Sequence, residues 1–498
     1  MPTKVTRLLV LAVLVGVCPA AAAQATRPAT EPAGPREKTV TTRHSILIEG
    51  HPLNYAATAG FLPIHNEEGK LQATLFYVAY AKEGQDVRSR PVTFAFNGGP
   101  GAASLWLHLG ALGPRRVPLA DDGKALPAAV RLVDNAYTWL DFTDLVFIDP
   151  VGTGYSTAAA GIEAKDFYGV QADVRSVGEF IRVYISQEGR WLSPIYLAGE
   201  SYGTTRAAAL AKHLQDRIGM NPSGLVLISS ALNFQPISFG HGNDLPYMLF
   251  LPSYAAVTWY HRQENGGPQT DLEGLLGRAE EFALDGYARA LAMGDSLGQQ
   301  QRKETVDALA EFTGLPREYI ERADLRISNA EFAKQVLHRR GLIVGLLDGR
   351  VTGLPTEATA QHLEYDPSLF VVEGPFTAAI QDYLRRDLGF VTTRRYVFLS
   401  QAANESWDWG PGGRGFLNTG RQLQEAMTQN PRLRVLGAAG IFDLTCGYFA
   451  QKYMFNHLHL APPLRDHVRF IAYPAGHQIY THEPSLRKLQ ADVAAFMK

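Results

Sequence analysis

Gly199-Glu200-Ser201-Tyr202-Gly203 is the stretch that decides the fold of this chain. It follows an apolar run, residues 195–198, and it precedes a helix-like segment, residues 204–214. A strand, the pattern Gly-x-Ser-x-Gly and a helix together make a nucleophile elbow, a sharp turn that exposes the serine hydroxyl at the end of a strand. We therefore predict that Ser201 is a catalytic nucleophile. The alternative is a tight turn in which the serine only caps the following helix.

A serine hydroxyl is a weak nucleophile, so it needs a base and a group that orients the base. Two segments near the C-terminus have the pattern of a strand, the first of them a buried one, followed by a polar residue. Residues 434–439 lead toward Asp443, and residues 468–473 lead toward His477. Chemistry in open α/β sheets gathers at the carboxyl ends of the strands, and the acid and then the histidine follow the serine in this kind of fold. Asp443 and His477 are the predicted partners, although each could instead be a local cap or turn residue.

A glycine-rich turn stands ahead of the elbow. Residues 91–96 are typical of a strand, and they lead into residues 97–101, Asn-Gly-Gly-Pro-Gly. Backbone N–H groups in such a turn can bind a developing oxyanion because no side chain stands in the way. The N–H of Tyr202, the residue after the nucleophile, is the expected second donor. An ordinary Gly/Pro turn would explain the glycines but not their position before the elbow.

The chain at this point resembles the serine carboxypeptidase family, the α/β-hydrolase peptidases that remove C-terminal residues. Four blocks carry the resemblance: residues 97–101 with 112–114; residues 135–139 with 149–156; residues 199–203; and the segments of Asp443 and Gly476-His477. The resemblance implies an α/β-hydrolase fold, a mostly parallel central sheet flanked by helices. Between residues 234 and 395 the strand signals fade and amphipathic helical segments appear, which predicts an inserted helical lid, with a peripheral helical decoration as the alternative. The alternation of apolar strands and helical segments between residues 145 and 228 independently favours a parallel sheet.

The resemblance also assigns roles to single residues. It implies that Ser201, Asp443 and His477 form a catalytic triad. It implies that the N–H groups of Gly99 and Tyr202 form the oxyanion hole.

A second set of residues is implied to bind the C-terminal carboxylate of the substrate: Asn97, Gly98 and Glu200. A charged Glu200 would repel that carboxylate, so Glu200 must be protonated to donate a hydrogen bond. Peptidase activity is therefore expected to fall as the pH rises past the pKa of Glu200. Tyr155 and Gln478 are candidate subsite residues.

The chain departs from the family pattern close to this site. Ala111 stands where the family often has a second Glu bonded to the first, and Gln478 stands where a Met usually follows the histidine. We predict an exported serine carboxypeptidase that acts through an acyl-enzyme on peptides with a free C-terminus. Because of the two departures, an esterase or acyltransferase with the same triad is the alternative. A non-catalytic peptide-binding scaffold is the second alternative.

The N-terminus has the pattern of a signal peptide, residues 1–25. Lys4 and Arg7 precede the apolar run 8–17, and small residues follow at a candidate cleavage site. We expect a flexible segment over residues 26–38, a periplasmic or secreted location, and no stable membrane insertion after cleavage. Cys18 would leave with the leader, so Cys446 would be the one cysteine of the mature protein.

The composition limits which classes of binding partner the chain is expected to have. The 47 Lys and Arg residues against 49 Asp and Glu residues give a formal net charge of −2, which argues against nucleic-acid binding. We find no paired His/Cys pattern for a metal and no phosphate-binding loop, so no cofactor is expected. The expected organisation is a hydrolase core over residues 39–233 and 396–498, interrupted by a mostly helical lid over residues 234–395.

Overall fold

The computed structural model describes residues 39–119, 130–264, 266, 271–357, 359–360 and 362–498. The predicted signal peptide and flexible segment, residues 1–38, lie outside the described residues. Contacts group Lys38–Lys498 into one unit. No helix in the described part of the chain combines the length and the apolar character that crossing a membrane requires.

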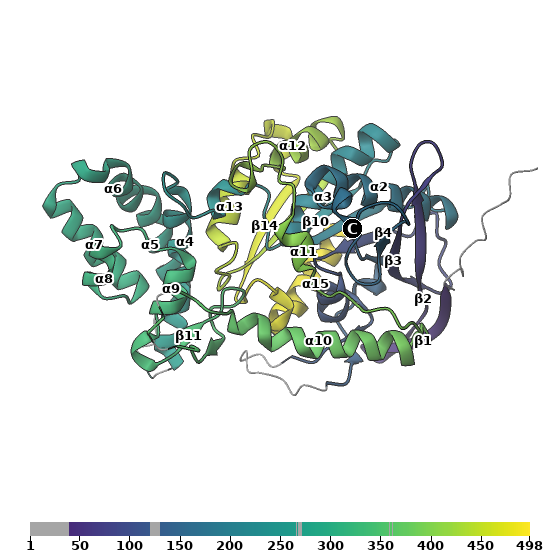
Figure 1. Cartoon of the computed structure of the whole chain (residues 1–498), viewed down its shortest axis with the longest axis horizontal. Helices are drawn as coiled ribbons and strands as arrows, with labels where there is room; N and C mark the ends of the chain where they lie inside the picture. The colour runs from purple at the N-terminus through teal and green to yellow at the C-terminus, as the bar shows by residue number, and fades with distance from the viewer. Residues whose placement is uncertain (1–38, 120–129, 265, 267–270, 358, 361) are drawn as a thin grey trace, which may run out of the picture. The chain divides into compact units, whose positions relative to one another are not determined.

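A central sheet organises this unit (Figure 1). Within the described residues it has ten strands in the order β1-β2-β3-β7-β4-β9-β10-β13-β14, with β8 paired to β3. The pairs from β7 to β14 are parallel, whereas β1, β2, β3 and β8 pair in antiparallel fashion. The strands are β1 Val40–Ile48, β2 His51–His65, β3 Leu71–Lys82, β4 Val92–Phe96, β7 Asp144–Ile148, β8 Thr157–Ala158, β9 Ile195–Glu200, β10 Gly224–Ile228, β13 Arg434–Gly440 and β14 Val468–Tyr473.

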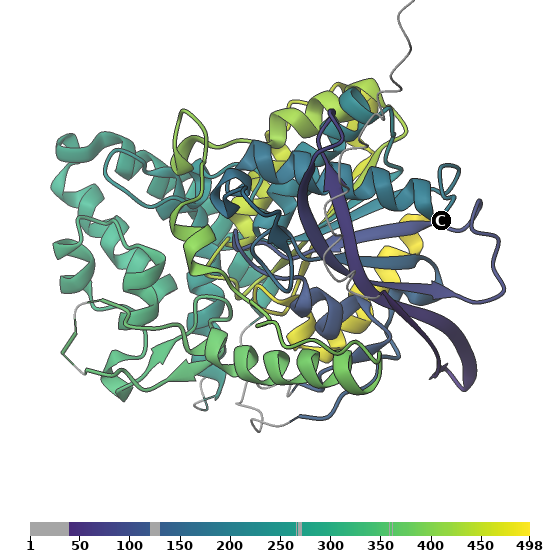
Figure 2. The ribbon, with the colours of Figure 1, turned by 45° about the vertical axis from the view of Figure 1, so that its right-hand side comes forward.

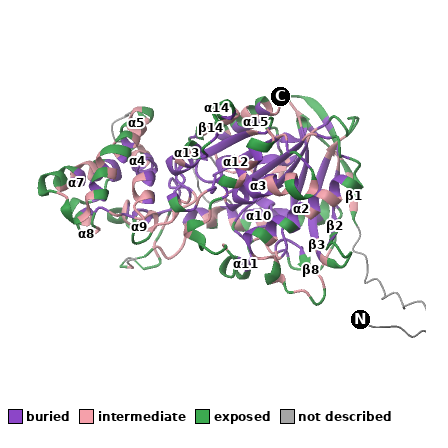
Figure 3. Ribbon diagram, turned by 90° about the horizontal axis from the view of Figure 1, so that it is seen from above, coloured by how far each residue is buried: buried purple, intermediate pink, exposed green. Residues whose placement is uncertain are grey.

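Burial explains why these segments form these strands. Every residue of β4, β7, β9 and β10 is buried, as expected for parallel strands that are covered on both faces. The edge strand β1 instead alternates between exposed and less exposed residues. Figure 3 shows the buried sheet between partly exposed helices. The predicted α/β-hydrolase fold class, with a mostly parallel sheet flanked by helices, is confirmed.

Helices cover the two faces of the sheet. On one face, residues of α2, α3 and α12 pack with alternate strand residues such as Leu197. On the other face, residues of α1, α10 and α15 pack with residues such as Ala198. The helices are α1 Leu105–Leu107, α2 Val170–Gln187, α3 Tyr202–His213, α10 Pro367–Arg386, α12 Gly420–Gln429 and α15 Glu483–Met497. The adjacent residues Leu197 and Ala198 thus point to opposite faces, as the pleat of a strand requires.

A group of helices lies between β10 and β13 in the sequence, and we call it the helical insertion. These helices form an apolar core of their own. Its helices are α4 Leu245–Glu264, α5 Leu272–Phe282, α6 Ala288–Met293, α7 Gln299–Thr313, α8 Arg317–Arg322 and α9 Asn329–Gln335. The same core includes Phe442 and Leu444, the two neighbours of Asp443. The insertion therefore packs against the segment that carries the predicted acid. Its role as a lid stays a prediction.

Helix α10 follows the insertion in sequence but packs elsewhere. Its residues Phe376 and Ile380 belong to the core on one face of the sheet. Figures 1 and 2 both show α10 running alongside the sheet, apart from α5 to α8. A short hairpin of β11 Ile343–Val344 and β12 Thr352–Gly353 precedes it. The remaining elements near the sheet are β5 Arg115–Arg116, β6 Val133–Asp134, α11 Gln401–Glu405, α13 Tyr448–Asn456 and α14 Pro462–Arg465.

Candidate active site

The predicted elbow is a strained turn between β9 and α3. Ser201 has φ 59° and ψ −128°, a backbone conformation that few residues other than glycine adopt. A Cβ added at Gly199 would lie 2.2 Å from the Gly203 carbonyl oxygen, and one added at Gly203 would lie 2.6 Å from the Phe96 carbonyl oxygen. Only glycine fits at both positions. The turn therefore sets the Ser201 hydroxyl at the end of β9, and Ser201 stays half-buried.

Asp443 and His477 form a buried pair. His477 Nδ1 lies 2.8 Å from Asp443 Oδ2. The other carboxylate oxygen, Asp443 Oδ1, accepts hydrogen bonds from the N–H groups of Thr445 at 2.7 Å and Cys446 at 3.0 Å. These two backbone bonds fix the carboxylate, and the carboxylate fixes the imidazole. With Nδ1 donating to Asp443, the other ring nitrogen, Nε2, is left to act as a base.

The fold brings this pair to the edge of the sheet where Ser201 lies. Strands β9, β10, β13 and β14 are parallel neighbours, so their carboxyl ends share one edge. The N–H of Ser201 donates to Ile228 O at the end of β10, at 2.9 Å. The next residue, Ser229, donates from its Oγ to the His477 carbonyl oxygen at 2.5 Å. Ser229 thus links the strand beside the elbow to the histidine loop.

The charge state of His477 depends on two opposed effects. Burial, the largest single effect, lowers the pKa of His477, but the Asp443 carboxylate and the Cys446 thiol together outweigh it, so the pKa of His477 is raised well above its ordinary value. The Cys446 thiol also lies beside the ring. In the described residues, Asp443, Cys446 and His477 place potential metal-ligand atoms within 4.8 Å of one another. Since His477 and Asp443 already bond each other, we assign no metal to this cluster.

The predicted oxyanion hole lies between the glycine-rich turn and α3. A Cβ added at Gly98 would lie 2.4 Å from the backbone nitrogen of Tyr202, so the two backbones touch. Tyr202 is the first residue of α3, where an N–H has no partner within the helix. No described residue accepts a hydrogen bond from the N–H of Gly99. Two backbone N–H groups near the elbow are thus left for an oxyanion, at the positive end of a helix dipole.

The residues expected to bind a carboxylate also come together. Asn97 Nδ2 donates to Glu200 Oε1 at 2.9 Å, and Asn97 Oδ1 accepts from the N–H of Leu107 at 3.0 Å. Glu200 is only 3 % exposed. Burial raises the pKa of Glu200 to about 7, against smaller lowering effects from His477, Tyr480 and Asn97. Glu200 is therefore largely neutral below pH 7 and can then act as a hydrogen-bond donor.

A buried ion pair between Arg206 and Asp173 stabilises the turn that carries Asn97. Arg206 Nε donates to Asp173 Oδ2 at 2.7 Å, and its Nη1 donates to the Asn97 carbonyl oxygen at 2.8 Å. The guanidinium also lies 5.1 Å from the Phe96 ring centroid and 5.4 Å from that of Tyr202. Arg206 thus holds both the glycine-rich turn and the start of α3.

The segment 346–349, between the insertion and α10, is bonded to both triad loops. The N–H of His477 donates to Leu347 O at 2.6 Å, and the N–H of Leu444 donates to Leu346 O at 2.9 Å. The N–H of Gly349 donates to Phe442 O at 3.0 Å. The acid and the histidine are therefore positioned partly by main-chain bonds from outside the central sheet.

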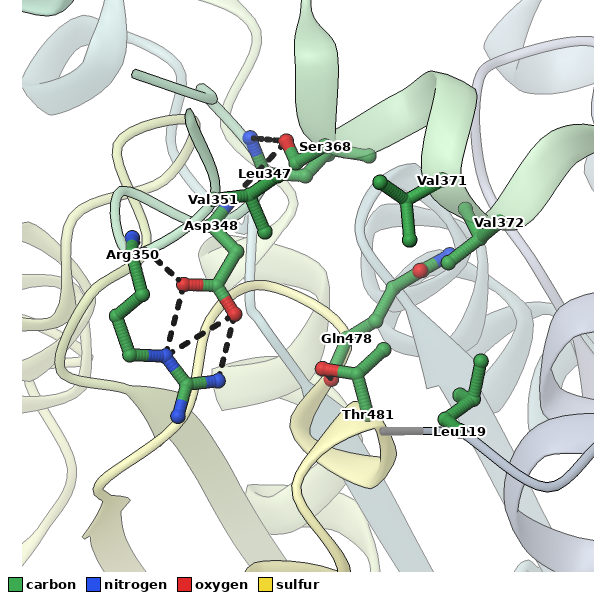
Figure 4. Close-up of a pocket in the computed structure, with 10 residues that line it drawn as sticks. All are labelled: Leu119, Leu347, Asp348, Arg350, Val351, Ser368, Val371, Val372, Gln478 and Thr481. Carbon is green, nitrogen blue, oxygen red and sulfur yellow. Dashed lines mark hydrogen bonds and ion pairs between the residues drawn. The ribbon is translucent and has the colours of Figure 1, made fainter. Parts of the chain in front are cut away.

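A pocket opens beside the histidine loop (Figure 4). Gln478 lines it together with apolar side chains of α10, Val371 and Val372, while Asp348 and Arg350 form an ion pair at 2.6 Å on another wall. The sequence-based prediction that Gln478 lines a subsite is compatible with this position.

Tyr155, the other candidate subsite residue, lies in an aromatic cluster. It is 7 % exposed, and its ring packs edge to face against Phe76 and Tyr396. This packing favours a structural role, and the subsite role stays a prediction. Sequence reasoning missed Ser229, Leu347 and Arg206, and it also missed Tyr480, treated below. The sequence signals among them are that Ser229 follows an apolar strand and that Tyr480 stands three residues after His477.

Comparison with known proteins relates part of the sequence to a family. Residues 49–244 match the family model described as serine carboxypeptidase. The pheromone-processing carboxypeptidase KEX1 of Cryptococcus gattii is 34 % identical over 161 residues, which are 30 % of this chain and 22 % of that protein. Serine carboxypeptidase-like 8 of Arabidopsis thaliana is 24 % identical over 205 residues, 41 % of this chain and 43 % of that protein. The matches thus span less than half the length of these relatives.

A solved structure extends the similarity in fold to most of the chain. The Kex1(delta)p structure, a prohormone-processing carboxypeptidase from Saccharomyces cerevisiae, aligns with a TM-score of 0.54 over 89 % of this chain and 91 % of that one. Its sequence is 14 % identical, so this comparison bears on the fold alone.

Proposed function

Because residues 49–244 match the family model described as serine carboxypeptidase, we propose that this chain is a serine-type carboxypeptidase that removes C-terminal residues from peptides. The observation that carries the proposal is the buried Asp443–His477 pair at the same sheet edge as the strained Ser201 turn. Asp443 and His477 lie outside the matched segment, so the geometry adds support that the family match does not contain.

The proposed reaction is acyl transfer through Ser201. His477 Nε2 takes the hydroxyl proton as the Ser201 oxygen attacks the scissile carbonyl carbon. The N–H groups of Gly99 and Tyr202 bind the resulting oxyanion, each contributing about 3 kcal/mol to the transition state. His477 then gives its proton to the leaving amine, the C–N bond breaks, and the acyl-enzyme remains. Water, deprotonated by His477, hydrolyses the ester and releases the shortened peptide.

Asp443 supports both halves of this cycle. It keeps the His477 proton on Nδ1 in the resting state, and it stabilises the imidazolium when Nε2 is also protonated. Asp443 raises the pKa of His477 by this stabilisation, and only the neutral fraction of His477 can act as the base.

Recognition of the C-terminus is proposed to involve Asn97, Gly98 and Glu200. Below about pH 7 the neutral Glu200 carboxyl can donate a hydrogen bond to the terminal carboxylate of the peptide. Above that pH the ionised Glu200 repels the same carboxylate. The enzyme is therefore expected to prefer free acids at acidic pH and to lose that preference as the pH rises.

A matched pair of substrates tests the proposal. The protein is given an N-blocked dipeptide with a free C-terminal carboxylate and the corresponding C-terminal amide, from acidic to neutral pH, with Ser201→Ala as the control. Preference for the free acid at low pH, absent in the variant, supports a serine carboxypeptidase. Ser201-dependent hydrolysis of esters without that preference would instead identify an esterase or acyltransferase. Failure of Ser201 to react with a serine-directed phosphonate would favour a non-catalytic scaffold.

Export is part of the proposal and depends on the sequence of residues 1–25 alone. Fractionation of cells that express the full chain, followed by mass analysis of the exported form, tests it. An unprocessed protein that stays inside the cell would contradict the proposed periplasmic or secreted location.

A further inference from the structure

Two buried polar atoms in the carboxylate site lack a hydrogen-bond partner. Glu200 Oε2 and Tyr480 Oη are both buried, and neither makes a hydrogen bond of normal geometry. The two side chains nevertheless interact electrostatically, and the Tyr480 hydroxyl also interacts with Asn97. Buried polar atoms are seldom left unpaired, so two of them on interacting side chains at a candidate site need an explanation.

The fold places Tyr480 here through two features of the backbone. Tyr480 lies in the short helix Ile479–Thr481, which follows His477 within three residues. Its ring covers Gly110, where an added Cβ would lie only 2.4 Å from ring atom Cε2. The next residue, Ala111, is fully buried in the same core. Gly110 thus leaves the space that the tyrosine ring fills.

The hydroxyl of Tyr480 differs chemically from the second glutamate carboxyl that the family often has at the position of Ala111. Burial keeps the pKa of Tyr480 well above its ordinary value, so the hydroxyl stays neutral. It therefore cannot share a proton with Glu200 as a second carboxylate could. It can donate a hydrogen bond to Glu200 Oε2, and this bond is stronger when Glu200 is ionised.

We propose that Tyr480 is a positioning residue for Glu200: its hydroxyl donates to Oε2 of the ionised carboxyl and so sets the pH above which the site rejects a terminal carboxylate. The inference builds on the proposed carboxypeptidase function, because it names what regulates the residue that reads the peptide C-terminus.

The other groups around Glu200 do not duplicate this role. His477 and Asp443 act on Glu200 through their charges, with opposite signs, and Asn97 Nδ2 already donates to the other oxygen, Oε1. From the remaining packed elements, Gly110 lies against the tyrosine ring, and Phe376 belongs to the same apolar core as the ring. Among the described side chains, Tyr480 supplies the hydroxyl that interacts with Glu200, and Oε2 is the Glu200 oxygen left without a partner.

The decisive variant is Tyr480→Phe, which removes one oxygen atom that makes no hydrogen bond of normal geometry in this structure. Its ring packing is retained, so the variant is expected to fold. Loss of a hydrogen bond to an ionised group should raise the midpoint of Glu200 titration by about one pH unit or more. Tyr473→Phe is the matched control, since Tyr473 donates to Asp492 instead.

Infrared titration of the intact protein measures this midpoint without any substrate. The protonated-carboxyl band of Glu200 is identified as the band that Glu200→Gln removes, which separates it from that of Asp149, whose pKa burial raises to about 7 as well. An upward shift in Tyr480→Phe, with none in Tyr473→Phe, is expected. An unchanged or lowered midpoint overturns the proposal.

The pH dependence of substrate preference tests this inference separately from the proposed carboxypeptidase function. If the chain is a carboxypeptidase, the pH at which the free acid loses its advantage over the amide should rise in Tyr480→Phe by the same amount. If wild-type protein shows no such advantage, the proposed function fails, while the infrared midpoint still decides whether Tyr480 controls Glu200.

Discussion

Replacement of Asp443 by asparagine should nearly abolish turnover, and the local hydrogen bonds show why. Asp443 Oδ1 accepts from two backbone N–H groups, those of Thr445 and Cys446. An asparagine must place its carbonyl oxygen there, because an amide nitrogen would leave two buried N–H groups unpaired at a cost of about 1–3 kcal/mol each. The amide nitrogen would then face His477 Nδ1, where Asp443 Oδ2 now lies at 2.8 Å.

This orientation reverses the tautomer of the base. An amide N–H that points at Nδ1 requires Nδ1 to accept, so the proton moves to Nε2, and Nε2 can no longer take the proton of Ser201. In a well-studied serine protease triad the same change lowers kcat by about 10⁴. We expect a similar loss here, which corresponds to about 5.5 kcal/mol in the activation free energy.

The assay is kcat for an N-blocked dipeptide, measured for wild type, Asp443→Asn and Ser201→Ala, with thermal unfolding to verify that each variant folds. Asp492→Asn is the matched control, a carboxylate bonded to Tyr473 and Lys488. If Asp443→Asn kept more than about a tenth of wild-type kcat while Ser201→Ala was inactive, the assignment of Asp443 as the triad acid would be wrong.

Three further predictions follow from the same site. Glutamine at position 200 cannot ionise, so the KM of Glu200→Gln for free acids should stay constant from pH 5 to 9. The wild-type KM should rise about tenfold per pH unit above the Glu200 pKa of about 7. Parallel KM–pH profiles for the two proteins would contradict this. Arg206→Met leaves the buried carboxylate of Asp173 unpaired, so the free energy of unfolding in denaturant should fall by about 3–5 kcal/mol. A decrease below about 1 kcal/mol would contradict this prediction. Gly98→Ala puts a methyl group 2.4 Å from the Tyr202 nitrogen and should lower kcat by about 10² or more. Gly277→Ala, in open space, should have no effect, and equal kcat values for the two variants would argue against this oxyanion hole.

The positions of Ser201, Asp443 and His477 could be predicted from sequence because each follows a strand, buried in β9 and β13 and mostly partly exposed in β14. A strand end is a local feature with a visible apolar pattern, and parallel strands bring their ends to one edge. The elbow glycines carry an equally local signal, since their close backbone contacts forbid any side chain. For the same reasons the fold class followed from the alternation of strands and helices.

Other parts of the site leave no such signal. Leu347 contributes a carbonyl oxygen, which every residue has, to a residue 130 positions away. Tyr480 is recognisable only once Gly110, far upstream in the chain, is seen beneath its ring. Tyr155 follows a strand and resembles a subsite residue in sequence, but its surroundings are the aromatic rings of distant segments. These features depend on tertiary contacts, which short sequence patterns do not encode.

The main-chain bonds from residues 346–349 to the loops of Asp443 and His477 constrain how this protein can be shortened or recombined. A truncated version that deletes the whole stretch between β10 and β13 would lose three peptide contacts that shape the catalytic loops. A chimera that exchanges helices α5 to α8 with those of a relative leaves these contacts in place. A segment that is deleted or exchanged should therefore end before residue 346. It should not extend to the end of α10.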